Sequence, residues 1–301
     1  MGSPLSRLRR AVTGWTPSFP PLPAYLADRV TPEHPAWFAR ELAVATGPPW
    51  WVWTFLIRRC WRLVTVFGRL EVTGSVAPEL RRGPVLIAAN HIGDFDMFVL
   101  AIALAKAGLV PRFLVTGGIM RTPLVGPALE RAGHIRVDRG TRDATLATEV
   151  TAVALAHGGQ VLAYPEGRVG LAPDGWPELG RSGLARLALE VGVPVLPVSQ
   201  WGAHEVLQYA NDWGKLRTAL SAVRRRPALR VHIGPPVDLA GLRLDRRGDA
   251  HRARARIAAA LTRGLATLRP GELGRPAYLD PTRPTTGVAA HPGGVVPDDV
   301  P

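Results

Sequence analysis

A histidine and a carboxylate five positions apart, His91 and Asp96, are the residues best suited to chemistry. In one continuous helix this spacing sets two side chains about 140° apart, so they meet only if His91 lies in a turn and Asp96 begins the helix. The carboxylate then fixes the imidazole tautomer, and the free nitrogen takes a proton from a hydroxyl, as a general base does. Asp94 is a rival partner by spacing. A surface histidine beside an acidic helix start is the alternative without function.

The segments around this pair have the pattern needed to place it in a turn. The apolar run Val85–Ala89 predicts a buried strand, and residues 97–105 predict a helix. Further along, strands are predicted at 70–73, 112–115, 135–137, 161–164, 193–198 and 229–233, and helices at 124–132, 143–157, 184–190 and 249–268. This alternation predicts an α/β fold with a central, largely parallel sheet flanked by helices. Prolines in 193–198 favour an edge strand or a strand end there.

Four ordered motifs resemble the signature blocks of the 1-acylglycerol-3-phosphate (lysophosphatidic acid) acyltransferase family. They span roughly residues 70–239 and read Asn90-His91-x4-Asp96, Gly133-His134-Ile135-Arg136-Val137-Asp138-Arg139, Tyr164-Pro165-Glu166-Gly167 and Val193-Pro194-Val195-Leu196-Pro197-Val198. The resemblance implies a bacterial glycerolipid acyltransferase in which His91 is the base and Asp96 orients it. It also implies that the second and third blocks bind substrate, through Arg139, Glu166 and Gly167.

The third block departs from the family pattern. The usual Glu-Gly-Thr-Arg is replaced by Glu166-Gly167-Arg168-Val169. Arg168 is a candidate to supply the missing guanidinium one residue early, or it points away, since neighbouring residues of an extended chain face opposite sides. Arg139 can hold a phosphate by a forked contact or pair with Asp138 or Asp143. Glu166 either binds the acceptor or holds its turn.

The resemblance implies transfer of a fatty acyl group from acyl-coenzyme A or acyl carrier protein to a lysophospholipid hydroxyl, most simply that of 1-acyl-sn-glycerol 3-phosphate, in phospholipid biosynthesis. The hydroxyl attacks the thioester directly, so no covalent enzyme intermediate is needed. No cofactor beyond the acyl donor and no metal site is expected. The altered third block motivates an alternative acceptor, such as another lipid or glycolipid hydroxyl.

The segment from Trp50 to Val64 has an unusual composition, with four of the nine tryptophans and three arginines. As a helix it would align Trp50, Trp53, Ile57, Trp61 and Val64 on one side, with Arg58, Arg59 and Arg62 largely elsewhere. Tryptophan prefers the membrane–water boundary, and arginine pairs with anionic headgroups. We therefore expect an interfacial helix on an anionic phospholipid membrane, although packing of the aromatics on the domain is the alternative.

The 301-residue chain has a formal net charge of +13 at pH 7, nearly all of it from arginine. Such a charge suits an anionic surface: phospholipid, a phosphorylated carrier or nucleic acid. A basic nucleic-acid-binding protein is the rival from another class, but it leaves the four motifs unexplained and no recognition motif accompanies it, so no nucleic acid is expected. His204 is a second candidate base, with a structural histidine favoured.

Three regions are expected along the chain. Residues 1–69 hold an irregular segment, with one short helix near 35–45, and the interfacial helix. Residues 70–269 form the α/β acyltransferase domain, and residues 270–301, rich in proline and glycine, form a disordered tail. No apolar run reaches the length of a transmembrane helix and no secretory signal is visible. The expected location is the cytoplasmic face of the cell membrane, peripheral or monotopic.

Overall fold

The computed structural model describes residues 24–47, 51–141, 143–170, 175–207 and 212–270. The strands are β1 (Arg69–Gly74), β2 (Val85–Ala89), β3 (Arg112–Thr116), β4 (Ile135–Val137), β5 (Gln160–Ala163), β6 (Val195–Trp201) and β7 (Ala228–Ile233). The helices are α2 (Ala24–Ala27), α3 (Ala36–Ala45), α4 (Trp51–Phe67), α5 (Pro78–Arg82), α6 (Asp96–Lys106), α7 (Gly117–Met120), α8 (Val125–Arg131), α9 (Ala144–Ala156), α10 (Gly183–Val191), the 3₁₀ helix η1 (Ala203–Glu205), α11 (Asp212–Arg225) and α12 (Asp249–Leu268).

The strands form one sheet in the order β1-β7-β6-β2-β5-β3-β4. Five neighbouring strands, β6, β2, β5, β3 and β4, run parallel to one another. The pair β1 and β7 is parallel within itself but antiparallel to β6. The predicted α/β fold with a largely parallel sheet is confirmed. The carboxyl ends of the five parallel strands share one edge of the sheet, which is where ligand sites gather in such folds.

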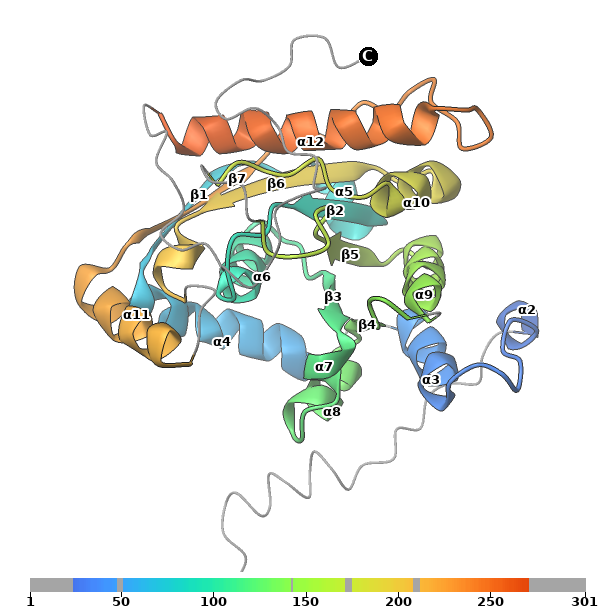
Figure 1. The fold of residues 1–301 in the computed structure, drawn as a ribbon, viewed down its shortest axis with the longest axis horizontal. Helices are drawn as coiled ribbons and strands as arrows, with labels where there is room; N and C mark the ends of the chain where they lie inside the picture. Colours follow the sequence, from blue (N-terminus) through green and yellow to red (C-terminus); the bar gives the residue numbers. More distant parts are fainter. Residues whose placement is uncertain (1–23, 48–50, 142, 171–174, 208–211, 271–301) are drawn as a thin grey trace, which may run out of the picture.

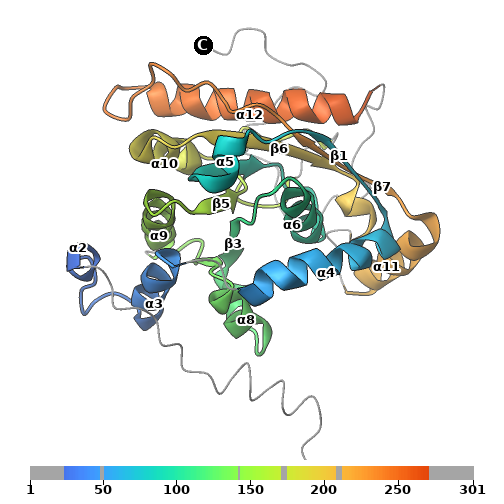
Figure 2. The same ribbon diagram turned by 180° about the vertical axis from the view of Figure 1, so that it is seen from behind.

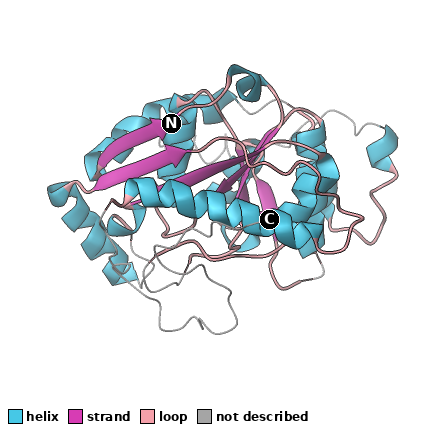
Figure 3. Ribbon diagram, turned by 90° about the horizontal axis from the view of Figure 1, so that it is seen from above, coloured by secondary structure: helices cyan, strands magenta, loops and turns pink. Residues whose placement is uncertain are grey.

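Strand β2 explains why helices cover both faces of the sheet. All five of its residues are buried, as a strand between two apolar layers requires. Val85, Ile87 and Ala89 face a core with α4 and α6, whereas Leu86 and Ala88 face a core with α3, α9, α10 and α12. Figures 1 and 2 show these two layers, and Figure 3 shows α12 lying across the strands.

The prolines of 193–198 predict an edge strand or a strand end. Strand β6 lies inside the sheet, between β2 and β7, so the edge alternative is wrong, whereas Pro194 does stand at the strand end, just before Val195. Pro197, within β6, is tolerated because the antiparallel pairing with β7 begins at Val198, one residue beyond it. Residues 212–225, for which no helix was predicted from the sequence, form the regular helix α11.

The N-terminal helices pack onto the sheet domain. Phe38 and Leu42 of α3 are fully buried in the core shared with α9, and Ile57 and Val64 of α4 are buried in the core shared with α6. The boundary expected near residue 70 stays a prediction, although the apolar contacts cross it. The expected tail lies almost entirely outside the described residues. Among the described helices, none is both long and apolar enough to cross a membrane.

Candidate functional site

His91 and Asp96 meet as their spacing requires. His91 lies in the turn after β2, and Asp96 is the first residue of α6. The His91 Nδ1 lies 2.8 Å from the Asp96 Oδ2. The same oxygen accepts hydrogen bonds from the backbone N–H groups of Ile92 at 2.7 Å and Gly93 at 3.1 Å. With Nδ1–H donated to the carboxylate, Nε2 is the ring nitrogen that can accept a proton from a substrate.

Asp96 is fully buried, and this burial raises the pKa of its carboxyl group above the usual value. The hydrogen bonds from His91, Ile92 and Gly93 oppose that shift, because they favour the charged form. A carboxylate in this setting has little freedom to move. It is therefore suited to hold the imidazole in one tautomer and one orientation.

Three further contacts fix His91 from the side of the third motif. Its backbone N–H donates to the Glu166 Oε1 at 2.9 Å, and its carbonyl accepts from the Gly170 N–H at 2.6 Å. Its ring stacks on Tyr164, with ring centroids 4.1 Å apart and an interplanar angle of 14°. The side chain of His91 is 17% exposed, so it is held on most sides yet open to a ligand.

Asp94 is not the partner of His91. Its Oδ2 forms an ion pair of 2.6 Å with the Lys215 Nζ of α11. Gly93, which precedes Asp94, lies close to the segment after β6. A Cβ added at Gly93 would be 3.1 Å from the Cα of His204 and from the Leu207 carbonyl oxygen. The turn that holds His91 is thus packed between α6 and the segment that leads to α11.

Glu166 is buried beneath the turn. Besides the His91 N–H, its carboxylate accepts the Glu178 N–H at 3.3 Å. Burial is the main reason that the pKa of Glu166 is raised to about 8. Of the two roles left open by the sequence, this geometry matches holding the turn. Gly167 follows with φ +67°, a left-handed conformation that favours glycine.

Arg168 lies beside this buried group rather than with Arg139. Its guanidinium is 3.6 Å from the carboxylate of Glu178, which is almost completely buried. Its charge therefore offsets that of a buried acid. The substrate-binding roles of Glu166, Gly167 and Arg168 stay predictions.

Arg139 lies in a second part of the same sheet edge. Past the ends of β3 and β4, an open cavity of about 420 Å³ is lined by Arg121, Arg136 and Arg139 among others. Asp138 pairs with Arg136 at 2.7 Å and with Arg121 at 3.0 Å. Arg139 itself is exposed. Asp143 also lines the cavity, so its described lining residues include three cationic and two anionic side chains, a small excess that favours an anionic group.

Asn90 and Gln200 form a buried link that the sequence did not single out. The Asn90 side chain donates to the Gln200 carbonyl at 3.0 Å and accepts its N–H at 2.8 Å, while the Gln200 amide donates to the Asn90 carbonyl at 3.0 Å. These bonds join the ends of β2 and β6 next to His91. Sequence placed Asn90 in the first motif, but nothing local identified a partner on a distant strand.

The other histidines near the motifs have structural settings. His134 is buried, accepts the Phe113 N–H at 3.0 Å, and has its pKa lowered to about 3 by burial and by Arg112. His204 is buried with its ring 4.5 Å from that of Trp201, and burial lowers its pKa to about 4. Both are therefore neutral at neutral pH. This matches the structural role that the sequence favoured for His204.

The predicted lipid-facing row of α4 is largely turned inward. Ile57 and Val64 are buried, and Trp53 packs edge-on against His134 at 4.5 Å. Trp61 is exposed, as is Arg62, and Trp50 lies outside the described residues. The structure describes the backbone but not the side chains of Arg58 and Arg59. The aromatics actually exposed on α4 are Trp51, Phe55 and Trp61, so membrane contact by Trp53 is corrected to internal packing.

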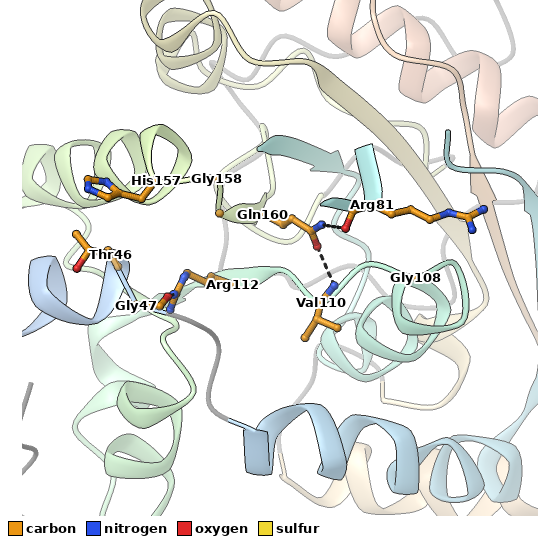
Figure 4. Close-up of a pocket in the computed structure, with 11 residues that line it drawn as sticks. Thr46, Gly47, Arg81, Gly108, Val110, Arg112, His157, Gly158 and Gln160 are labelled. Atoms are coloured by element: carbon orange, nitrogen blue, oxygen red, sulfur yellow. Dashed lines mark hydrogen bonds between the residues drawn. The ribbon is translucent and has the colours of Figure 1, made fainter. Parts of the chain in front are cut away.

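A separate cavity of about 380 Å³ lies at the opposite ends of the strands, beside the starts of β3 and β5 (Figure 4). Gln160 crosses it, accepting the Val110 N–H and donating to the Arg81 carbonyl. The charged ends of Arg81 and Arg112 point apart in Figure 4. The cavity thus has no converging set of charged groups comparable to the edge near His91.

Comparison with known proteins agrees with this geometry. Residues 69–201 match the model of a family described as Acyltransferase. A stretch of 139 residues is 33% identical to the lyso-ornithine lipid O-acyltransferase of Pseudomonas aeruginosa, covering 46% of this chain and 51% of that protein. A stretch of 155 residues is 31% identical to an uncharacterized protein of Mycobacterium tuberculosis, covering 48% of this chain and 40% of that one. The chain thus spans about half the length, or less, of these curated relatives.

The fold has a counterpart among solved structures. The crystal structure of PlsC from Thermotoga maritima, a 1-acyl-sn-glycerophosphate acyltransferase, matches with a TM-score of 0.54. The match covers 81% of this chain and 87% of that one at 20% sequence identity. At that identity the likeness concerns the fold alone.

Proposed function

Residues 69–201 match a family described as Acyltransferase, and on that premise we propose that the protein is a member of the glycerolipid acyltransferase family, an O-acyltransferase acting on a lipid hydroxyl. The observation that carries the proposal is the pair His91 and Asp96, joined at 2.8 Å in the turn that follows the carboxyl end of β2. The second motif contains β4, and its last residues, Asp138 and Arg139, follow that strand at the same edge.

In the proposed reaction, the acceptor hydroxyl donates its proton to the His91 Nε2 while its oxygen attacks the carbonyl carbon of an acyl thioester. The C–S bond then breaks, and the imidazolium returns the proton to the departing thiolate. Asp96 stabilises the transient positive charge on His91 and keeps Nδ1 protonated. The donor is acyl-coenzyme A or acyl carrier protein, and the step needs no covalent enzyme intermediate and no metal.

The proposed acceptor is a lysophospholipid, most simply 1-acyl-sn-glycerol 3-phosphate. Its support is the cavity with Arg121, Arg136 and Arg139, because paired guanidinium groups suit a phosphate. Arg168 lies 3.6 Å from the Glu178 carboxylate and is not among the described residues that line this cavity, so a phosphate contact by Arg168 stays a separate prediction. Arg139 is therefore the residue most directly implicated in phosphate recognition.

A second acceptor class has support of its own. The sequence relative in Pseudomonas aeruginosa is named for a lyso-ornithine lipid, whose headgroup is an amino acid rather than a phosphate. The altered third motif, Arg168-Val169, also departs from the pattern of the lysophosphatidic acid enzymes. The same chemistry at His91 would serve this acceptor.

We further propose that the protein works at a membrane surface, on the cytoplasmic face, as a peripheral or monotopic enzyme. Its net charge of +13 and the exposed Trp51, Phe55 and Trp61 of α4 support contact with anionic phospholipid. A nucleic-acid partner is not proposed.

The test of this function uses purified protein, isotope-labelled acyl-coenzyme A or acyl carrier protein, and a panel of acceptors. The panel contains lysophosphatidic acid, an uncharged monoacylglycerol and lyso-ornithine lipid, with products identified by mass spectrometry. We expect a diacylated product with at least one acceptor. Loss of thioester without any acylated lipid, or no turnover with any donor, would refute the proposal.

A further inference from the structure

The exposed large hydrophobic side chains found among the described residues are concentrated in neighbouring elements. They belong to α4, α6, α7, the start of α8 and α11: Trp51, Phe55, Trp61, Val66, Phe98, Ile119, Leu124, Val125, Trp213, Leu216, Leu220 and Val223. In Figures 1 and 2, α11, α4 and α7–α8 line the side of the molecule away from α12. An apolar surface on this scale is typical of a docking face.

Helix α11 contributes the most exposed of these side chains and has an inverted amphipathic pattern. Its inward face is made of small or polar residues, with Thr218 and Ala222 buried. Its outward face has Trp213 at 81% exposure and Leu220 at 62%. A helix that only covered a core would place these side chains inward. The outward row is therefore unexplained by folding alone.

Two cations border the outward row. At about 100° per residue, Arg217 and Arg224 project beside Trp213 and Leu220, and both are exposed. An aromatic and aliphatic stripe flanked by arginines is the pattern of a helix that lies in the interface of an anionic bilayer. The same residues explain why a second copy of the chain is a poor partner. In a two-fold interface the patch meets itself, which would bring Arg217 and Arg224 of both copies, four like charges, into one interface.

Helix α11 is tied both to α4 and to the candidate catalytic turn. The Arg226 guanidinium, just past the end of α11, donates to the Thr65 carbonyl of α4 at 2.7 Å. Near the other end, Lys215 pairs with Asp94 at 2.6 Å, three residues from His91. A surface that binds α11 is therefore brought next to the turn that holds the base.

We propose that α11 is a second membrane-docking helix, which lies with α4 on an anionic lipid bilayer and brings the His91 turn to the lipid surface. This inference rests on the proposed function for its acceptor, a lipid drawn from that bilayer, but the docking itself does not. The consequence is that an acceptor embedded in the membrane reaches His91 without leaving the bilayer.

The docking test measures binding of the full chain to vesicles of phosphatidylcholine with and without phosphatidylglycerol, by flotation. The variant replaces Trp213, Leu216 and Leu220 by glutamine, which keeps helix propensity and removes the exposed apolar row. Because these side chains are exposed, we expect an unchanged melting temperature. We expect the affinity for anionic vesicles to fall by ~10-fold or more.

A charge arm separates local docking from overall charge. Arg217→Glu with Arg224→Glu is compared with Arg247→Glu and Arg263→Glu, a pair of exposed arginines before and within α12. Both doubles change the net charge equally. We expect the α11 pair to weaken binding to anionic vesicles clearly more than the α12 pair. Equal losses would assign the attraction to net charge and overturn a specific role for α11.

An activity arm compares an acceptor embedded in vesicles with a short-chain acceptor that stays monomeric. The glutamine variant is expected to keep the wild-type rate on the monomer and to lose rate on vesicles. Absence of any transfer by the wild type refutes the proposed function while leaving the flotation result standing. Unchanged flotation by the folded glutamine variant overturns the docking proposal. If the wild type is a dimer and the glutamine variant is a monomer with unchanged flotation, the exposed row is a dimer contact, and the docking proposal is overturned as well.

Discussion

The imidazole of His91 has one ring nitrogen committed to Asp96 and one left for a substrate. Replacing His91 by alanine removes the proposed base but leaves intact the backbone bonds to Glu166 and Gly170. We therefore expect acyl transfer to fall about 10²–10⁴-fold with an unchanged circular dichroism spectrum. The measurement is the rate of labelled lipid formation at saturating donor. Turnover close to wild type in the folded variant would refute the base assignment.

The two acids of the turn give a matched comparison. Asp96→Asn loses the charge that stabilises protonated His91 and favours the wrong tautomer, so we expect kcat to fall strongly. Asp94→Asn loses only an ion pair with Lys215 at the surface of the turn, so we expect a much smaller effect. Both variants are compared at several pH values. A larger effect of Asp94→Asn would reverse the roles of the two acids.

Two buried acids make stability depend on pH. The pKa is raised from 4.5 to about 8 both for Glu166 and for Glu41 of α3, mainly by burial. Unfolded glutamate ionises near 4.5, so the folded state holds protons that the unfolded state has lost between these values. Their stabilising contribution is present below pH 4.5 and is lost as pH rises through about 8. We expect thermal melts to show this fall.

The glutamine variants check the cause of that fall. Glu166→Gln and Glu41→Gln should each flatten the profile of melting temperature against pH, because an amide does not titrate. The exposed Glu79 of α5 supplies the control variant, Glu79→Gln. A profile for Glu166→Gln and Glu41→Gln as steep as that of wild type would contradict the assignment.

At this residue scale the sequence predicted the contact between His91 and Asp96 but not its surroundings. The spacing of His91 and Asp96 required a turn followed by a helix start, and the structure has that arrangement. The choice between Asp94 and Asp96 stayed open because it depends on Lys215, which a distant helix supplies. The partners of Asn90 and Glu166 were hidden for the same reason, since each is a contact between strands or loops far apart in the chain.

Among the elements, α4 has aromatic side chains of two kinds: one that packs inside the protein and others that are exposed to bind a surface. Trp53 packs on His134, whereas Trp51 and Phe55 are exposed at 73% and 48%. Trp53→Ser should therefore lower the melting temperature. Removal of a fully buried tryptophan costs about 3–5 kcal/mol of unfolding free energy, and the loss should be smaller here because Trp53 is only partly buried. Trp51→Ser with Phe55→Ser should leave stability unchanged and weaken vesicle flotation. The reverse pattern would mean that α4 presents the other face to the membrane.

Element types were predicted well where periodicity reflects burial. The range of α12 and that of β4 agree with the sequence prediction at both ends. Helix α11 was missed because its apolar residues point outward and its polar and basic residues dominate the composition. For β6, the prolines of 193–198 left an edge and a strand end open, because sequence does not show that the antiparallel pairing with β7 begins at Val198, one residue after Pro197.

For the whole molecule, the charge of +13 predicts a salt-sensitive association with anionic vesicles. The Debye length shrinks from about 30 Å at 0.01 M salt to about 3 Å at 1 M, so attraction of surface arginines is largely screened at high salt. We expect flotation with phosphatidylglycerol vesicles to decline steeply over this range. Binding to neutral phosphatidylcholine vesicles, which depends on the apolar side chains, should change little. Salt-independent binding to anionic vesicles would show that the arginines do not contribute.

The order of the strands was beyond reach of the sequence. Alternating strands and helices indicated a parallel sheet, and five strands follow that rule. The reversal of β7 against β6 depends on how α11 returns the chain to the sheet, which local pattern does not encode. The family resemblance supplied the fold because its four motifs belong to strands that end at one edge.

The strands β1 and β7, which run antiparallel to β6, connect α4 and α11 rigidly. Gly68 alone separates α4 from β1, and Arg226 and Pro227 alone separate α11 from β7, while β1 and β7 are hydrogen-bonded neighbours. The two helices thus continue almost directly into one two-stranded ribbon and have no linker in which to swing. If α4 and α11 both bind to the bilayer, His91 would be held at a fixed distance from the acyl chains. Acceptor selectivity would then depend on how far the reacting hydroxyl extends from the membrane. The backbone, rather than any side chain, would set this distance.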